Sequence, residues 1–135
     1  MSDFFSNWYE LLAYLGDFSE DMYNENLYIS IGLCMALIPV GVLTLYYYAI
    51  NSVRFSKWWH WTLLVVFLCG INFGIAYSVS INELSYLYEQ QNKVLPYGIE
   101  FFSFSLINVF WTFVVSFVWS MMIKWGSKHC RRTPF

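Results

Sequence analysis

The residues that could carry chemistry in this chain are few, and they form no catalytic or metal-binding pattern. The two histidines, His60 and His129, lie far apart, whereas a zinc site needs three or four ligands. Glu20 and Asp21 are paired carboxylates in a polar stretch, and general acid–base catalysis needs a shaped pocket around such a pair. No GxSxG, HExxH or P-loop motif occurs. We therefore expect no enzyme, no cofactor and no metal site.

The three cysteines add no redox or metal motif, because no two of them are close in the sequence. Cys34 and Cys69 fall inside apolar stretches, where cysteine usually behaves as a small hydrophobic residue. Cys130 lies in the basic C-terminal tail. We expect an unmodified side chain there, with acylation as the alternative.

Regularly spaced polar side chains occur in the last apolar stretch. Asn108, Thr112, Ser116 and Ser120 recur at intervals of four, so on a helix they form a polar ridge. Such a ridge could line a pathway for water or ions. We favour a structural role, in which these side chains bond to their own backbone and to neighbouring helices, for example toward Asn72.

Small residues recur in the middle apolar stretch. Gly70, Gly74 and Ser78 are each four residues apart, and Asn72 lies among them. Small side chains allow two helix backbones to approach closely, and a buried amide can bond across the contact. We expect these four residues to form a helix-packing or oligomer face. The pattern leaves open whether the contact lies within one chain or between copies.

These residues belong to three long stretches without charged side chains, at about 26–48, 58–82 and 101–123. A helix of about 23 residues is roughly 35 Å long, enough to cross a hydrocarbon core of about 30 Å. Only 12% of the chain is charged, against about 25% in globular domains. We therefore expect an all-α integral membrane protein with three transmembrane helices in an antiparallel bundle. Gly32 and Ala36 form a second small-residue pair in the first stretch.

The spans divide the chain into an outward-facing segment 1–25, a three-span bundle 26–123 and a basic tail 124–135. Residues 2–15 are expected to form an amphipathic helix that lies in the membrane interface, on a partner or on the protein's own spans. Its expected apolar face contains Phe4, Trp8, Leu11, Leu12 and Leu15. Its expected polar face contains Asp3, Asn7 and Glu10.

The connection 83–100 between the second and third spans is acidic and aromatic. Its first half can continue the second helix beyond the membrane, with Leu84 and Tyr88 on one side. Together with Trp8 and Leu11, these residues are candidates for docking a partner protein. The alternative is a solvated loop.

Charge asymmetry predicts the topology of the chain. All nine acidic residues lie in 3–25 and 83–100, whereas six of the seven basic residues lie in 54–57 and 124–132. The positive-inside rule then places the N-terminus outside and the C-terminus in the cytoplasm, in a plasma or bacterial inner membrane. The first 25 residues have no basic residue, so no cleavable signal peptide is expected. No basic patch suits nucleic acid.

These features lead to two functional hypotheses. The first is a small non-enzymatic membrane protein that acts as a subunit or interaction partner of a membrane complex, for example in envelope or secretion assembly or in immunity to a membrane-targeting toxin. Its partners would be the lipid bilayer, other membrane proteins, or itself as a homo-oligomer. The alternative is a self-assembling, holin-like pore or membrane-permeabilising effector, in which the polar ridge would line the lumen. A small transport module has only the ridge in its favour.

Overall fold

The computed structural model describes residues 2–50 and 57–126, which form helices and turns without any strand. In chain order the helices are α1 (Ser2–Glu10), α2 (Asp17–Asn24), α3 (Leu27–Thr44), η1 (Leu45–Ile50), α4 (Trp58–Gln90), α5 (Ile99–Ile123) and η3 (Lys124–Gly126). η1 continues α3 as a π-helix, and η3 continues α5 as a 3-10 turn. The expectations for Arg54, His129, Cys130 and the rest of 51–56 and 127–135 lie outside the described residues.

Three helical segments are long and apolar enough to cross a membrane, namely Leu27–Ala49, Trp58–Gln90 and Ile99–Gly126. They correspond to the three stretches identified from the sequence, which confirms an all-helical chain with three candidate membrane spans. α4 has 33 residues, a length of about 50 Å. α4 is therefore longer than the thickness of a hydrocarbon core, which is about 30 Å.

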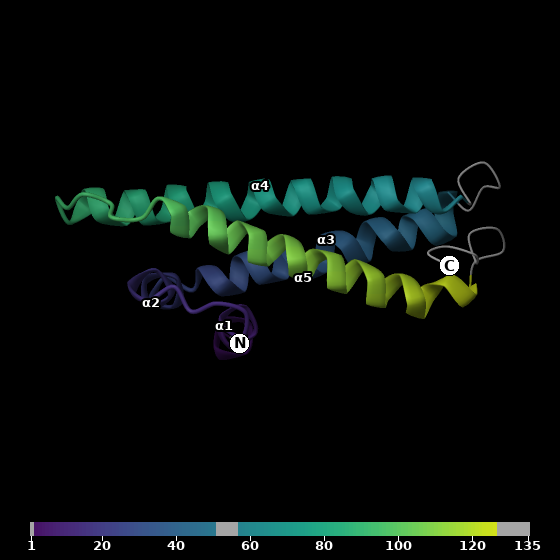
Figure 1. The fold of residues 1–135 in the computed structure, drawn as a ribbon, viewed down its shortest axis with the longest axis horizontal. Helices are drawn as coiled ribbons and strands as arrows, with labels where there is room; N and C mark the ends of the chain where they lie inside the picture. The colour runs from purple at the N-terminus through teal and green to yellow at the C-terminus, as the bar shows by residue number, and fades with distance from the viewer. Residues whose placement is uncertain (1, 51–56, 127–135) are drawn as a thin grey trace.

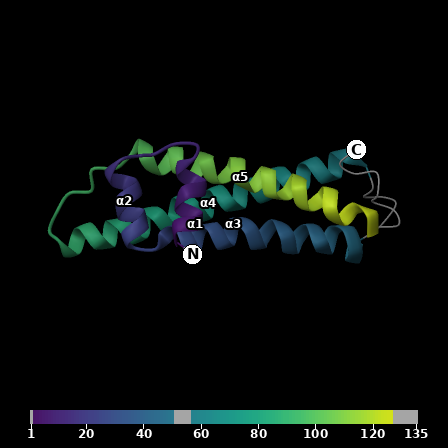
Figure 2. The ribbon, with the colours of Figure 1, turned by 90° about the horizontal axis from the view of Figure 1, so that it is seen from below.

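The chain reverses its direction from α3 to α4 and again from α4 to α5 (Figure 1). Trp61, near the start of α4, bonds to Ser120 near the end of α5, and Asn72 contacts Asn108 further along both helices. α3 packs against both of these helices. α1 and α2 lie across α3 and α5 instead of along them (Figure 2). The two short helices are therefore part of the folded bundle.

The hydrophobic core has two parts, and the first includes α1 and α2. Its centre is Phe104, whose ring centroid lies 5.0–5.9 Å from those of Tyr9, Phe18 and Tyr28. Because aromatic side chains bury large areas, these contacts hold α1 and α2 against the long helices. The second part lies toward the other end of the bundle and contains Leu43, Tyr46, Tyr47, Trp61, Val65 and Leu68.

The N-terminal helix is shorter than the expected one over residues 2–15. α1 ends at Glu10, and residues 11–16 are not helical. Gly16 has a φ of 59°, a conformation that glycine adopts without the steric cost of a Cβ atom. The chain then forms α2, where the sequence suggests a polar linker or a short helical turn.

The expected apolar face of this helix is correct only for Trp8 and Leu15, which pack against the core. The large buried side chains of α1 are Phe5 and Tyr9, with Ser6 buried beside them, whereas Phe4 and Leu11 are largely exposed. The cause is a tertiary fit, because Phe5 lies against Gly32 of α3 and Tyr9 reaches α5. Spacing within the N-terminal segment holds no information about either neighbour.

Candidate functional site

Asn108 joins three helices at a single buried point. The Tyr9 hydroxyl of α1 donates to Asn108 Oδ1 at 2.5 Å, and Asn108 Nδ2 donates to the backbone carbonyl of Asn72 in α4 at 2.9 Å. Asn72 and Asn108 have no exposed surface. Hydrogen bonds between helices inside a membrane typically contribute about 0.6–2 kcal/mol each, so this point helps to fix α1 and α4 on α5.

The rest of the polar ridge is also buried between helices. Thr112 Oγ1 donates to the Asn108 carbonyl at 2.8 Å, and Ser116 Oγ donates to the Thr112 carbonyl at 2.7 Å. Ser120 Oγ accepts from the indole Nε1–H of Trp61 at 2.9 Å. None of the four ridge side chains is exposed. Within one chain the ridge therefore borders no water-filled path.

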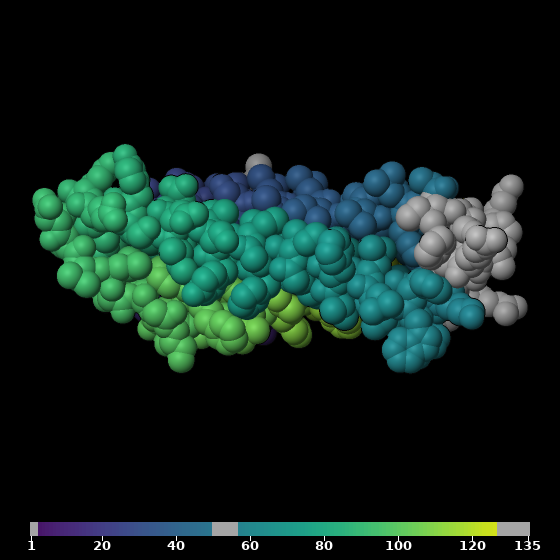
Figure 3. Space-filling model, turned by 90° about the horizontal axis from the view of Figure 1, so that it is seen from above, coloured from purple at the N-terminus to yellow at the C-terminus, as the bar shows by residue number. Residues whose placement is uncertain are grey.

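The four residues expected to share one face of α4 lie on two different sides of it. Gly70, Gly74 and Ser78 are exposed, and a Cβ atom on either glycine would meet nothing within 4 Å. Asn72 is buried on the opposite side, because two helical residues amount to a rotation of about 200°. The small-residue face thus points away from the rest of the described chain. Figure 3 shows α4 forming a long outer surface of the molecule.

Asp21 is the centre of a second polar cluster, at the end of the bundle that contains α2. Its Oδ2 atom accepts hydrogen bonds from the hydroxyls of Tyr88 and Tyr97, each at 2.8 Å. Desolvation, followed by the bonds to Tyr88 and Asp21, raises the pKa of Tyr97 above its ordinary value. The cluster ties α2 to the end of α4 and to the connection before α5.

The four candidate docking residues have different environments. Leu84 is 0% exposed, so it cannot contact a partner while the chain is folded. Tyr88 is half-buried and bonded to Asp21, and Trp8 is half-buried with its ring centroid 5.1 Å from that of Trp111. Leu11 alone is open, with 74% of its surface exposed. Leu84 is therefore excluded as a docking residue, because α4 turns it toward the core.

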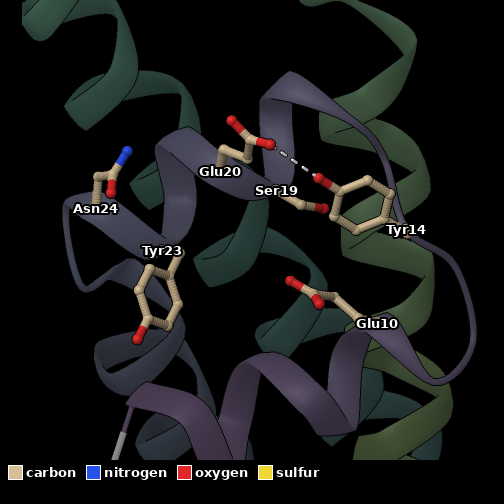
Figure 4. A pocket seen from close by; sticks show the side chains of 6 residues that line it. All are labelled: Glu10, Tyr14, Ser19, Glu20, Tyr23 and Asn24. Carbon is tan, nitrogen blue, oxygen red and sulfur yellow. Dashed lines mark hydrogen bonds between the residues drawn. The ribbon is translucent and has the colours of Figure 1, made fainter.

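A polar pocket of about 250 Å³ lies between α1 and α2 (Figure 4). It is lined by Glu10, Tyr14, Ser19, Glu20, Tyr23 and Asn24. Tyr14 donates to Glu20 at 3.1 Å, and this bond is the main cause of a raised Tyr14 pKa. Ser19 Oγ accepts the backbone N–H of Leu15 at 3.1 Å. The pocket contains acceptors but no nucleophile paired with a base, as a hydrolytic centre would require.

Within residues 2–50 and 57–126, no three His, Cys, Asp or Glu side chains are placed to hold a metal ion. Sequence reasoning missed two hydrogen-bonding contributors to the interior, Tyr9 and the pair Trp119–Thr44. Trp119 Nε1 donates to Thr44 Oγ1 at 3.0 Å. A usable signal existed, because a Tyr or Trp in an apolar setting needs a partner for its polar atom.

Comparison with known proteins gave no match: no protein-family model, no curated protein and no solved structure is similar to this chain.

Proposed function

We propose that the chain is a non-enzymatic membrane protein that crosses the bilayer three times as an antiparallel bundle and acts as a subunit or interaction partner of other membrane proteins. The N-terminus lies outside and the C-terminus in the cytoplasm of a plasma or bacterial inner membrane. One observation carries the proposal. The small-residue face of α4, formed by Gly70, Gly74 and Ser78, is exposed along a helix that is apolar enough to span a membrane.

The energetics of helix association in lipid support this role for the exposed face. Lipid chains are as apolar as leucine, so helices associate through close van der Waals packing where side chains are small. Gly70 and Gly74 leave such a surface open and contribute nothing to packing within the described chain. A helix of a partner protein, or of a second copy, can approach the α4 backbone closely there.

The alternative role as a pore has less support. A lumen lined by Asn108, Thr112, Ser116 and Ser120 would require these side chains to face water. They are buried, and three of them are bonded to the Asn72, Asn108 or Thr112 backbone carbonyls. Opening such a lumen would separate α5 from α4 and α1 and break the contacts at Asn108.

The test replaces Gly70 and Gly74 together by leucine in a chain tagged at its C-terminus and purified from native membranes. We expect co-purified proteins, or a second copy of the chain, to fall about tenfold, which corresponds to about 1.4 kcal/mol of association free energy. The assay is the mass and composition of the solubilised complex. Folding should persist, because a Cβ atom at either position meets nothing within 4 Å.

Gly41→Leu is the matched control. Gly41 lies exposed on α3, and a Cβ atom there also meets nothing within 4 Å. The control adds one leucine side chain at an equally open position of a different helix, so association should stay at the wild-type level. Unchanged association of the double variant would refute the proposed role of the α4 face.

A further inference from the structure

An apolar groove of about 330 Å³ lies between α4 and α5. It is lined by Trp61, Thr62, Val65, Val66, Cys69, Val109, Phe110 and Phe113. The Thr62 hydroxyl donates to the Trp58 carbonyl at 3.1 Å, and the Cys69 thiol is 3.9 Å from the Val109 carbonyl. The hydroxyl and thiol of the lining are thus engaged by backbone carbonyls, and the indole N–H of Trp61 by Ser120 Oγ. The groove offers a hydrocarbon surface about 10 Å long, from Thr62 to Cys69.

Lys124 lies at the end of α5 on the same side as this groove. Phe110, Phe113, Phe117 and Lys124 follow one another at spacings of three, four and seven, which places them along one side of the helix. Lys124 is only 8% exposed, which is rare for a lysine unless its charge is paired. Its ammonium lies 5.6 Å from the ring centroid of Trp125, and no carboxylate among the described residues pairs with it.

No acidic side chain belongs to this end of the bundle. All nine Asp and Glu residues occur in 3–25 and 83–100, on the two short helices and at the opposite end of α4 and α5. Among the described residues, no anion therefore pairs with the charge on Lys124. Lysine commonly pairs with phosphate as a point charge.

The N-terminus of α4 adds further positive potential at the same end. Lys57 is its N-cap residue, is exposed, and provides no side-chain cap for the first N–H groups. Free N–H groups and the helix dipole favour an anion at such a terminus. The bond from Trp61 to Ser120 aligns the start of α4 with the end of α5. Lys57 and Lys124 thus lie at one end of the bundle.

We infer that this end of the bundle binds one anionic phospholipid, with its phosphate at Lys57 and Lys124 and one acyl chain in the groove between α4 and α5. Trp58 and Trp59, stacked at 4.2 Å and more than half exposed, lie where indoles occupy the headgroup level. A zwitterionic lipid would bring an ammonium group next to two lysines with no carboxylate to receive it. The inference depends on membrane insertion, but on no protein partner.

The test is native mass spectrometry of the full chain in a neutral detergent with equal amounts of dioleoyl phosphatidylglycerol and dioleoyl phosphatidylcholine. We expect one retained phosphatidylglycerol, with about a tenfold preference over phosphatidylcholine. Lys124→Gln should reduce this preference to about unity. Lys93→Gln removes one positive charge from the exposed connection at the opposite end and should leave the preference unchanged.

Equal retention of the two lipids, or equal effects of the two variants, would overturn the phosphate assignment.

A phosphatidylglycerol with a photoreactive group in its acyl chain tests the groove in the wild-type chain, without any substitution. Adducts are expected on 61–69 and 109–113, and adducts elsewhere would overturn the groove assignment. Displacement of the bound phosphatidylglycerol by inorganic phosphate would also overturn the groove assignment. Release of the chain from membranes by alkaline carbonate would refute insertion itself, independently of lipid preference.

Discussion

Gly32 is the residue on which the docking of α1 depends most directly. A Cβ atom at this position would lie 2.4–2.8 Å from three ring atoms of Phe5, closer than packed atoms can approach. Phe5 is itself buried, so its ring has little room to move. The absence of a side chain at Gly32 is therefore what lets α1 lie flat against α3.

We predict that Gly32→Ala destabilises the docked state of α1 by about 1–3 kcal/mol, because the added methyl group overpacks the contact with Phe5. The measurement is hydrogen–deuterium exchange of the 2–10 segment in detergent, where faster exchange is expected. Gly41→Ala is the control, since its Cβ atom meets nothing within 4 Å. Equal exchange in the two variants would contradict this reading of Gly32.

At the scale of helices, α1 and α2 are both held by packing in the core and by hydrogen bonds of tyrosine hydroxyls. α1 is bound by packing on α3 and by the buried bond from Tyr9 to Asn108. α2 is bound by the burial of Phe18 and Met22 in the core and by Asp21, which accepts hydrogen bonds from Tyr88 and Tyr97. The hydroxyls of both tyrosines must keep their protons to donate these bonds. The part of the α2 attachment that depends on Asp21 therefore responds to alkaline pH, whereas the core packing of α2 does not.

We predict that this attachment weakens in alkali. The folded pKa of Tyr97 lies above its unfolded value near 10. Its stabilising contribution is then complete below about pH 10 and is lost as the pH rises toward the folded pKa. The thermal unfolding midpoint in detergent should fall as the pH rises above about 10. Tyr97→Phe should lower the midpoint at pH 8 and make it less dependent on pH.

Tyr86→Phe, at an exposed position of α4, is the control. A decrease in the midpoint that is the same in both variants would disprove the role of Tyr97.

At the scale of the whole molecule, charge is separated along the bundle. The acidic residues of α1, α2 and the connection before α5 lie toward one end, and Lys57 and Lys124 lie at the other. Lys93 is the only basic residue of the acidic regions, and it is exposed. A bilayer that follows the positive-inside rule places Lys93 outside and Lys57 in the cytoplasm.

We predict that a membrane-impermeant amine reagent modifies Lys93 in intact cells and modifies Lys57 only after permeabilisation. Peptide mass spectrometry measures both sites in the same sample. Lys57 is exposed in the folded chain, so a lack of reaction in intact cells reflects the membrane and not burial. Modification of Lys57 in intact cells would mean that the bundle has the opposite orientation.

The sequence by itself determined the helical class, the number of candidate spans and their approximate limits. A single long stretch without charge can satisfy its own backbone polar groups in lipid only as a helix, so composition is sufficient to predict the spans. The separation of acidic and basic residues is likewise a property of the linear chain. These features depend on residue type and order, and not on which neighbours pack together.

Only the tertiary structure decided which side of each helix faces inward. Asn72 and Gly70 are two residues apart in a uniformly apolar helix, yet one is buried and the other exposed. In a soluble helix the polar side identifies the surface, but lipid and protein core are both apolar, so this signal is lost. The same holds for α1, where Phe5 and Tyr9 are buried while Phe4 and Leu11 are exposed. This choice depends on the shape of α3 at Gly32 and on the hydrogen-bond partner Asn108 in α5. Neither is contained in the local pattern of α1.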